Sequence, residues 1–412
     1  MNYLKIEEIA AKWGVSARAV QILCKEGKIA GAARFGRAWM VPEDAERPVD
    51  RRTKEGRVLD EENQPLPRKS PFLYMTDLYS VPGTADEASQ KLLYHQEAKE
   101  LFCAEVAYAR GEIDKVYASA SYLLGKHSSF YAVISAGMLL AQCAVWRGDL
   151  ELWRTAKMHI SEAPAAKTDL DRDIMLFAIC AVDIMLYNVT DFPDWFRLGC
   201  FEPLHKDALP AARVYYAKYL NAAAYSVATG EYSIEGMEGL SLMRVLPCAL
   251  EPMISQAQAD SSLVSEICLR LNCAAMYHNG GDDEQAARHL DQAIALALPD
   301  KLYGLLAEYC RAVDSLLEQR MMRISPEAWQ AVRSLYRVYN EGWSHLSGSV
   351  RGKTLATTLS VREREVAKLA AFGLSNAQIA EKLHMSVSVV KQSIRVASEK
   401  TGMSRREFAK VL

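Results

Sequence analysis

Residues 359–412 read LSVREREVAKLAAFGLSNAQIAEKLHMSVSVVKQSIRVASEKTGMSRREFAKVL, and this stretch decides how the rest of the chain is interpreted. In three places a serine stands three residues before an acid or amide: Ser360 and Glu363, Ser375 and Gln378, Ser404 and Glu407. In such a capping box each side chain accepts a hydrogen bond from the other residue's backbone N–H at a helix start. The segment is therefore predicted to begin a helix at each serine.

Apolar residues follow these starts at helical spacing, which predicts that the helices pack around a shared core. They are Val366, Leu369 and Ala370, then Ile379, Ala380 and Leu383, then Val390, Ile394 and Ala397. Gly373 supplies the left-handed residue that ends the first helix. Ser386 opens the third helix after a very short turn, which is typical of a helix-turn-helix.

The third helix, 386–400, is predicted to present Lys391, Gln392 and Arg395 away from the core residues Val390 and Ile394. A helix of this diameter fits the major groove of B-DNA, where lysine and arginine match guanine and glutamine matches adenine. The alternative is a helical cap on a larger fold, with an ordinary solvated basic face.

The whole segment resembles the LuxR-type helix-turn-helix family. The resemblance rests on L-S-x-R-E-R-E-V, then G-L-S-N-x-x-I-A-x-x-L, then S-x-x-x-V-K. It implies a four-helix domain in which Lys391, Gln392 and Arg395 face bases. It also implies phosphate contacts from Ser386, Ser388, Arg405 and Arg406, and a dimer contact on a last helix over 407–412. Val389 departs from the family's usual threonine, so a phosphate-binding hydroxyl is lost there unless Ser388 substitutes.

Charge is distributed unevenly along the 412 residues. Residues 351–412 carry 12 Lys/Arg and 5 Asp/Glu, a charge of +7, and residues 1–58 carry 12 and 8, a charge of +4. Because the net charge of the chain is −2, the middle segment carries −13. An acidic body with basic ends suits a protein that contacts nucleic acid at its ends. With 50% hydrophobic and 24% charged residues, the composition is that of an ordinary soluble protein of two to four domains.

The first 50 residues contain a second candidate DNA reader. Helical spacing predicts two short helices separated by Gly14, the second capped by Ser16, and Phe35-Gly36-Arg37 predicts a hairpin. The order resembles the winged helix-turn-helix of excisionase and MerR-like proteins over residues 3–45. The residues predicted to bind DNA are Ser16, Arg18, Gln21, Arg34 and Arg37. The alternative is a structural or protein-docking wing with a solvated basic edge.

Residues 51–84 are rich in charge and proline and are predicted to be a linker, after which 85–346 has helical periodicity. A glycine followed by an acid recurs between amphipathic helices at 111, 148, 230 and 281, and the surrounding pattern resembles the tetratricopeptide repeat. The fold class is thus mainly α: a tetratricopeptide-like solenoid flanked by the two readers, with a hinge at 347–358. Tyrosines could line a concave groove, although an aromatic at helical spacing is more often core: Tyr108, Tyr122, Tyr131, Tyr215, Tyr216, Tyr219 and Tyr225.

No phosphate-binding loop, paired carboxylates or Ser/His/Asp arrangement stands out, so no enzymatic activity and no cofactor are expected. The nine cysteines occur without a C-x-x-C pair, which predicts neither a metal site nor disulfides. No signal peptide or membrane span is evident, so a cytoplasmic location is expected.

The sequence favours a sequence-specific DNA-binding transcription regulator. It is expected to act as a homodimer on double-stranded DNA, with a peptide, protein or small-molecule effector at the repeats. The alternative is a repeat-type adaptor that binds proteins and reads no DNA.

Overall fold

The computed structural model describes residues 3–25, 29, 31–36, 38–45, 79–90, 96–126, 128–163, 168–228, 239–351 and 359–408. They divide into two compact units, within 1–64 and 65–412. Helices dominate both units, which confirms the predicted mainly α class. Most of the predicted linker, including residues 51–78, lies outside the described residues.

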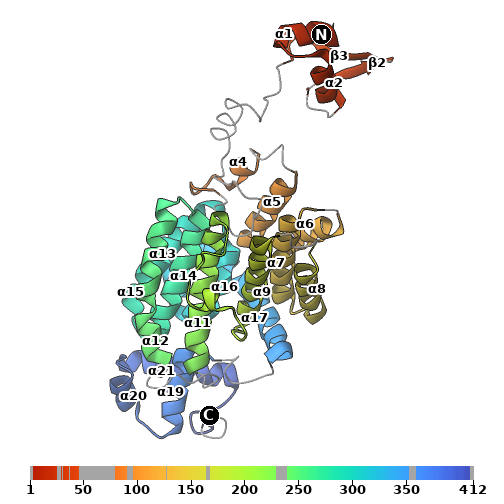
Figure 1. Cartoon of the computed structure of the whole chain (residues 1–412). Helices are drawn as coiled ribbons and strands as arrows, with labels where there is room; N and C mark the ends of the chain where they lie inside the picture. Colours follow the sequence, from red (N-terminus) through yellow and green to blue (C-terminus); the bar gives the residue numbers. More distant parts are fainter. Residues whose placement is uncertain are drawn as a thin grey trace. The chain divides into compact units, whose positions relative to one another are not determined.

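The amino-terminal unit consists of two helices and a small sheet. Its elements are β1 (Tyr3–Lys5), α1 (Ile6–Trp13), α2 (Ala17–Lys25), β2 (Ala33–Phe35) and β3 (Ala38–Pro42) (Figure 1). The strands are antiparallel in the order β1-β3-β2. β1, which was not predicted, pairs with β3, the second strand of the hairpin. Ile9, Val20 and Val41 are fully buried between the helices and the sheet.

The larger unit is helical throughout its described residues. Its elements up to the carboxy-terminal domain are α4 (Ala85–Gln90), α5 (Gln96–Arg110), α6 (Ile113–Gly125), α7 (Phe130–Arg147), α8 (Leu150–Ser161), α9 (Asp169–Ile184), α10 (Asp194–Arg197), η1 (Lys206–Ala208), α11 (Leu209–Ala228), α12 (Gly239–Val245), α13 (Pro247–Ala259), α14 (Leu263–Gly280), α15 (Asp283–Ala297), η2 (Leu298–Asp300), α16 (Tyr303–Ile324) and α17 (Pro326–Arg351). The carboxy-terminal domain contributes α19 (Val361–Ala371), α20 (Asn376–Lys382) and α21 (Val387–Thr401).

The recurring glycine-acid pair closes helical hairpins. Gly111, Gly148 and Gly281 all adopt positive φ, a backbone conformation that glycine tolerates without strain. In two copies the acid that follows caps the next helix: Asp149 accepts from Leu152 N at 2.9 Å and Asp282 from Gln285 N at 3.0 Å. The pair therefore ends one helix and starts the next. The copy at 230–231 lies outside the described residues.

The hairpins do not form an open solenoid in which each repeat contacts only its neighbours. α17 packs along α7 and α16 packs on α5, so the last helices return to the first (Figure 1). Glycines permit this closure, because a Cβ at Gly342 of α17 would overlap the Trp146 carbonyl, and one at Gly304 would overlap backbone atoms of Tyr108 and Gly111. The predicted tetratricopeptide-like solenoid is therefore not confirmed.

Polar side chains connect α5, α11 and α16 across the interior of the repeat helices. Glu308 of α16 accepts a 2.8 Å hydrogen bond from Tyr108 of α5 and pairs with Lys218 of α11. Tyr215 and Tyr225 are also buried in the core. Of the seven tyrosines considered for a groove, three are thus core residues, and Tyr122 is exposed. Tyr131, Tyr216 and Tyr219 are partly buried against the core.

α7 is long and apolar enough to span a membrane, but 83% of it is buried among its neighbours, as in the core helix of a folded domain.

The end of α17 differs from the predicted boundary. This helix continues to Arg351, five residues into the predicted hinge, and residues 352–358 lie outside the described part.

We expect Gly342→Ala to destabilise the fold, because the added methyl must push α17 away from α7. Overpacking of this kind lowers the free energy of unfolding by about 1–3 kcal/mol. Gly125→Ala is the matched control, since a Cβ there meets nothing within 4 Å and its φ is not positive. Urea unfolding followed by circular dichroism checks both, and equal midpoints would contradict the close helix crossing.

Candidate nucleic-acid interface

The three helices α19, α20 and α21 pack around a core of their own. Val366, Ile379 and Val390, one from each helix, are fully buried. Two of the three predicted capping boxes are confirmed: Ser360 and Glu363 bond reciprocally at 2.8 and 3.2 Å, and Ser375 and Gln378 at 2.8 and 3.3 Å. Gly373, with φ +84°, ends α19 as predicted.

Glu363 also fixes the far end of α21. Its carboxylate is almost fully buried and accepts a 2.6 Å hydrogen bond from Lys400 Nζ in the last turn of that helix. Because a buried charge requires a partner, this ion pair ties the start of α19 to the end of α21. It holds α21 at a fixed angle within the domain.

The turn before α21 is tight. His384 adopts a positive φ of 51°, and the Ser386 side chain caps α21 by accepting from Val389 N at 3.3 Å. Ser386 Oγ lies 2.8 Å from Ser388 Oγ, and both side chains are exposed. Two hydroxyls and the amino end of a helix thus meet the solvent together, a setting that favours phosphate.

The side chains predicted to read bases lie on the outer face of α21. Lys391 and Arg395 are exposed and Gln392 is half-buried, whereas Val390 points into the core. Arg395 donates to Gln392 Oε1 at 3.3 Å and pairs with Glu399 at 3.0 Å, across an exposed helix face. A pair this exposed contributes little stability, so the guanidinium can exchange Glu399 for a base edge at small cost.

The two arginines that follow α21 differ. Arg406 is exposed, but the Arg405 guanidinium donates to Leu374 O and Asn376 Oδ1 and so ties the last turn to the α19–α20 turn. The structure describes the predicted fourth helix only as far as Phe408. Before that residue, the Ser404 backbone N–H donates to Glu407 Oε2 at 2.8 Å.

Comparison with known families agrees with this geometry. A family model described as bacterial regulatory proteins, luxR family (GerE), matches residues 357–409. The helix-turn-helix is of the LuxR type. The chain therefore carries the DNA-binding domain of a transcription regulator. No curated protein and no solved structure gives a significant match to the chain.

The LuxR-type domain is held on the repeat helices by buried polar contacts. Arg362 of α19 is 6% exposed, and its guanidinium donates to His278 O and to Asp283 Oδ1, both at 3.2 Å. It also contacts His278 Nε2, while His278 Nδ1 lies 2.6 Å from Asp283 Oδ1. Since Arg362 can only donate, His278 Nε2 must accept, which places the imidazole proton on Nδ1, facing the carboxylate.

Two other side chains complete what we call the docking contacts. Tyr225 OH donates to Leu359 O at 2.8 Å, and Arg244, which also donates to Gly280 O at 2.8 Å, donates to Leu383 O. On the LuxR-type domain the docking contacts thus involve α19, Leu359 just before its N-cap and the α20–α21 turn. α19 packs on α11, α12 and α14, and the extensive contacts of α21 are with α19 and α20. The recognition face is therefore left uncovered by the docking contacts.

Burial alone would raise the pKa of Asp283, but the hydrogen bond from His278 and the charge of Arg362 hold it below its ordinary value. Because the pKa of Asp283 is lower in the folded protein than in the unfolded chain, the ionised carboxylate stabilises the folded state at pH values above the ordinary pKa. This stabilisation is lost as the pH falls through the lowered pKa of the folded protein. The contribution of the ionised Asp283 carboxylate is thus fully present at neutral pH.

In the amino-terminal unit, four predicted site residues are exposed: Ser16, Arg18, Gln21 and Arg34. The Ser16 hydroxyl accepts from Ala19 N at 3.2 Å, so it also caps α2. Arg37 lies outside the described residues.

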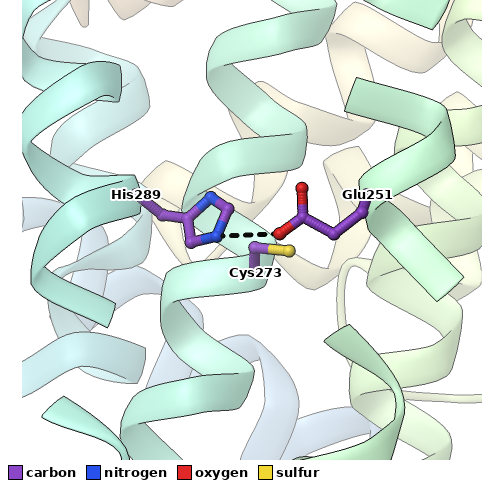
Figure 2. A group of neighbouring side chains, drawn as sticks. All are labelled: Glu251, Cys273 and His289. Atoms are coloured by element: carbon purple, nitrogen blue, oxygen red, sulfur yellow. Dashed lines mark ion pairs between the residues drawn. The ribbon is translucent and has the colours of Figure 1, made fainter. Parts of the chain in front are cut away.

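One group of side chains has metal-ligand chemistry that the sequence did not reveal. Glu251, Cys273 and His289 come together from α13, α14 and α15, and Figure 2 shows their polar atoms converging. They are 22 and 16 residues apart, with no short-range spacing to suggest a site. Their meeting departs from the predicted lack of a metal site.

We expect Arg362→Ala to loosen the LuxR-type domain, because the substitution removes hydrogen bonds to Asp283 and His278 and leaves the carboxylate without its cation. Hydrogen bonds to charged groups contribute about 1.5–3 kcal/mol, so amide exchange in 361–371 should accelerate at least about tenfold. Lys368→Ala, an exposed change on the same helix, is the control. Unchanged protection in Arg362→Ala would show that the docking contacts do not hold the domain.

Proposed function

We propose that the protein is a sequence-specific DNA-binding transcription regulator whose helical repeats respond to a ligand or protein partner. The observation that carries this proposal is the outward face of α21, where Lys391, Gln392 and Arg395 stand clear of the docking contacts. Guanidinium, ammonium and amide groups are the donors that read base edges in the major groove. The location expected for such a function is cytoplasmic, and no enzymatic activity is assigned.

Phosphate contacts would set the domain on the duplex. The exposed hydroxyls of Ser386 and Ser388 lie at the amino end of α21, and Arg406 follows its far end. Contacts to phosphates fix orientation, whereas base contacts give specificity. The Arg405 guanidinium already donates to Leu374 O and Asn376 Oδ1, so we expect it to stabilise the α19–α20 turn. A phosphate contact from Arg405 would have to replace these hydrogen bonds.

We also propose that the amino-terminal unit is a winged helix-turn-helix reader. α1 and α2 are joined through Gly14, and the β2–β3 hairpin places Arg34 on an exposed strand. Arg18 and Gln21 are exposed on α2, the helix that would enter the groove. Two different readers would let the chain contact two DNA segments.

The helical hairpins between the readers resemble tetratricopeptide units closed by a returning pair. Their proposed role is to bind an effector and to present the LuxR-type domain in a defined orientation. Domains of this type act in pairs on half-sites about one helical turn apart, so we propose a homodimer.

The double variant Lys391→Ala/Arg395→Ala is expected to lose sequence preference while keeping its circular dichroism spectrum. Each base-reading side chain contributes about 1–3 kcal/mol, so affinity for a selected operator should fall by on the order of 100-fold, with a smaller loss on random DNA. The control Lys115→Ala/Arg154→Ala removes equal charge from exposed repeat positions. An unchanged preference in the first variant would rule out α21 as the reader.

Arg406→Ala is expected to weaken binding to all sequences alike, because it removes a phosphate contact. The slope of log affinity against log salt should become shallower by about 0.9. A protein-binding adaptor, the other interpretation, would show no operator and no such slope, so titrations at several salt concentrations distinguish the two.

A further inference from the structure

Glu251, Cys273 and His289 converge where α13, α14 and α15 pack together (Figure 2). Glu251 Oε1 lies 3.2 Å from His289 Nε2, and one ligand atom from each residue lies within 4.8 Å of the other two. Cys273 and His289 are buried, whereas the Glu251 side chain is 49% exposed. The cluster is thus a buried sulfur and nitrogen with a carboxylate open to solvent.

We propose that these three residues bind a divalent transition-metal ion of the zinc class. Thiolate, imidazole and carboxylate are the three ligand types of protein zinc sites, whereas magnesium and calcium prefer oxygen alone. With metal–ligand distances of about 2.0–2.3 Å, ligand atoms of a tetrahedral site lie roughly 3.3–3.8 Å apart. The Glu251–His289 pair already has this separation, and the site needs only a small inward shift of the remaining atoms.

Charge balance favours such an ion. The Glu251 carboxylate and the Cys273 thiolate together neutralise a divalent cation, which removes most of the cost of burying it. The neutral imidazole ring of a histidine such as His289 is the form that binds metals. Arg270, whose charge acts on His289, is held by Glu266 at 2.8 Å and by Gln292.

Proton release accompanies coordination. Cysteine binds metals as the thiolate, and a cysteine away from cations and metal ions is mainly the thiol at neutral pH. On binding, the S–H proton passes to solvent and the sulfur forms the bond to the metal, with no change of oxidation state. Binding should therefore release one proton per ion and tighten as the pH rises.

The described cluster supplies three protein ligands. A water molecule is the candidate for the fourth position, as in zinc sites with three protein ligands.

Two of the three helices of the cluster also carry docking contacts. Cys273 lies five residues before His278 on α14, and His289 lies six residues after Asp283 on α15. Glu251 is on α13, which follows the helix of Arg244 along the chain. An ion that draws these helices together acts on the segments that hold the LuxR-type domain. This regulatory part rests on the proposed function, whereas metal binding itself does not.

The test is titration of the untagged, metal-free full chain with Co²⁺, followed by displacement with Zn²⁺. We expect one ion per chain, a thiolate-to-cobalt charge-transfer band and visible bands of tetrahedral cobalt. Glu251→Gln, an isosteric change at an exposed position, should weaken binding by at least about tenfold, and Cys273→Ser should abolish the charge-transfer band. Cys103→Ser, which removes an exposed thiol outside the cluster, should leave both unchanged.

Failure to bind Zn²⁺ stoichiometrically, or a charge-transfer band that survives in Cys273→Ser, would overturn the metal site. The contact between Glu251 and His289 would then only join α13 to α15. Amide exchange in 361–371 tests the regulatory part without DNA: Zn²⁺ should alter protection in the parent but not in Glu251→Gln. Zinc binding with unaltered exchange would leave the metal site standing and refute its link to the docking contacts.

Discussion

The burial of one guanidinium fixes how the LuxR-type domain packs on the repeat helices. Arg362 can lie inside the protein only because Asp283 supplies the opposite charge and His278 supplies two acceptors. These partners stand at the α14–α15 turn, so α19 must face the repeats. Lys391 and Arg395 of α21 stay exposed to solvent in this arrangement, and the proposed reading of DNA depends on their exposure.

Features encoded by neighbouring residues could be predicted from the sequence. The capping boxes at Ser360 and Ser375 join residues three positions apart, and Gly373 needs only its own backbone conformation. The outward position of Lys391 and Arg395 follows from helical periodicity once Val390 is placed in the core. Local rules therefore describe most of the recognition domain, and the hairpin turns at Gly148 and Gly281 follow from the same kind of rule.

Contacts between distant segments could not be predicted in this way. Nothing near Gly342 indicates that it meets Trp146, and nothing near Arg362 indicates a partner 79 residues earlier at Asp283. The Glu363–Lys400 pair was missed because Glu363 was assigned only its capping role. The cluster of Glu251, Cys273 and His289 was missed because its spacing matches no short metal-binding motif, and β1 because three residues carry too little pattern.

The most direct test of the DNA-reading function is selection of bound fragments from random DNA by the full chain, repeated with residues 359–412 removed and with residues 1–50 removed. We expect the full chain to enrich a sequence motif with two related half-sites, and this motif to be lost without 359–412. Persistence of the same motif without these residues, or no enrichment by the full chain, would contradict the assignment of α21 as the recognition helix.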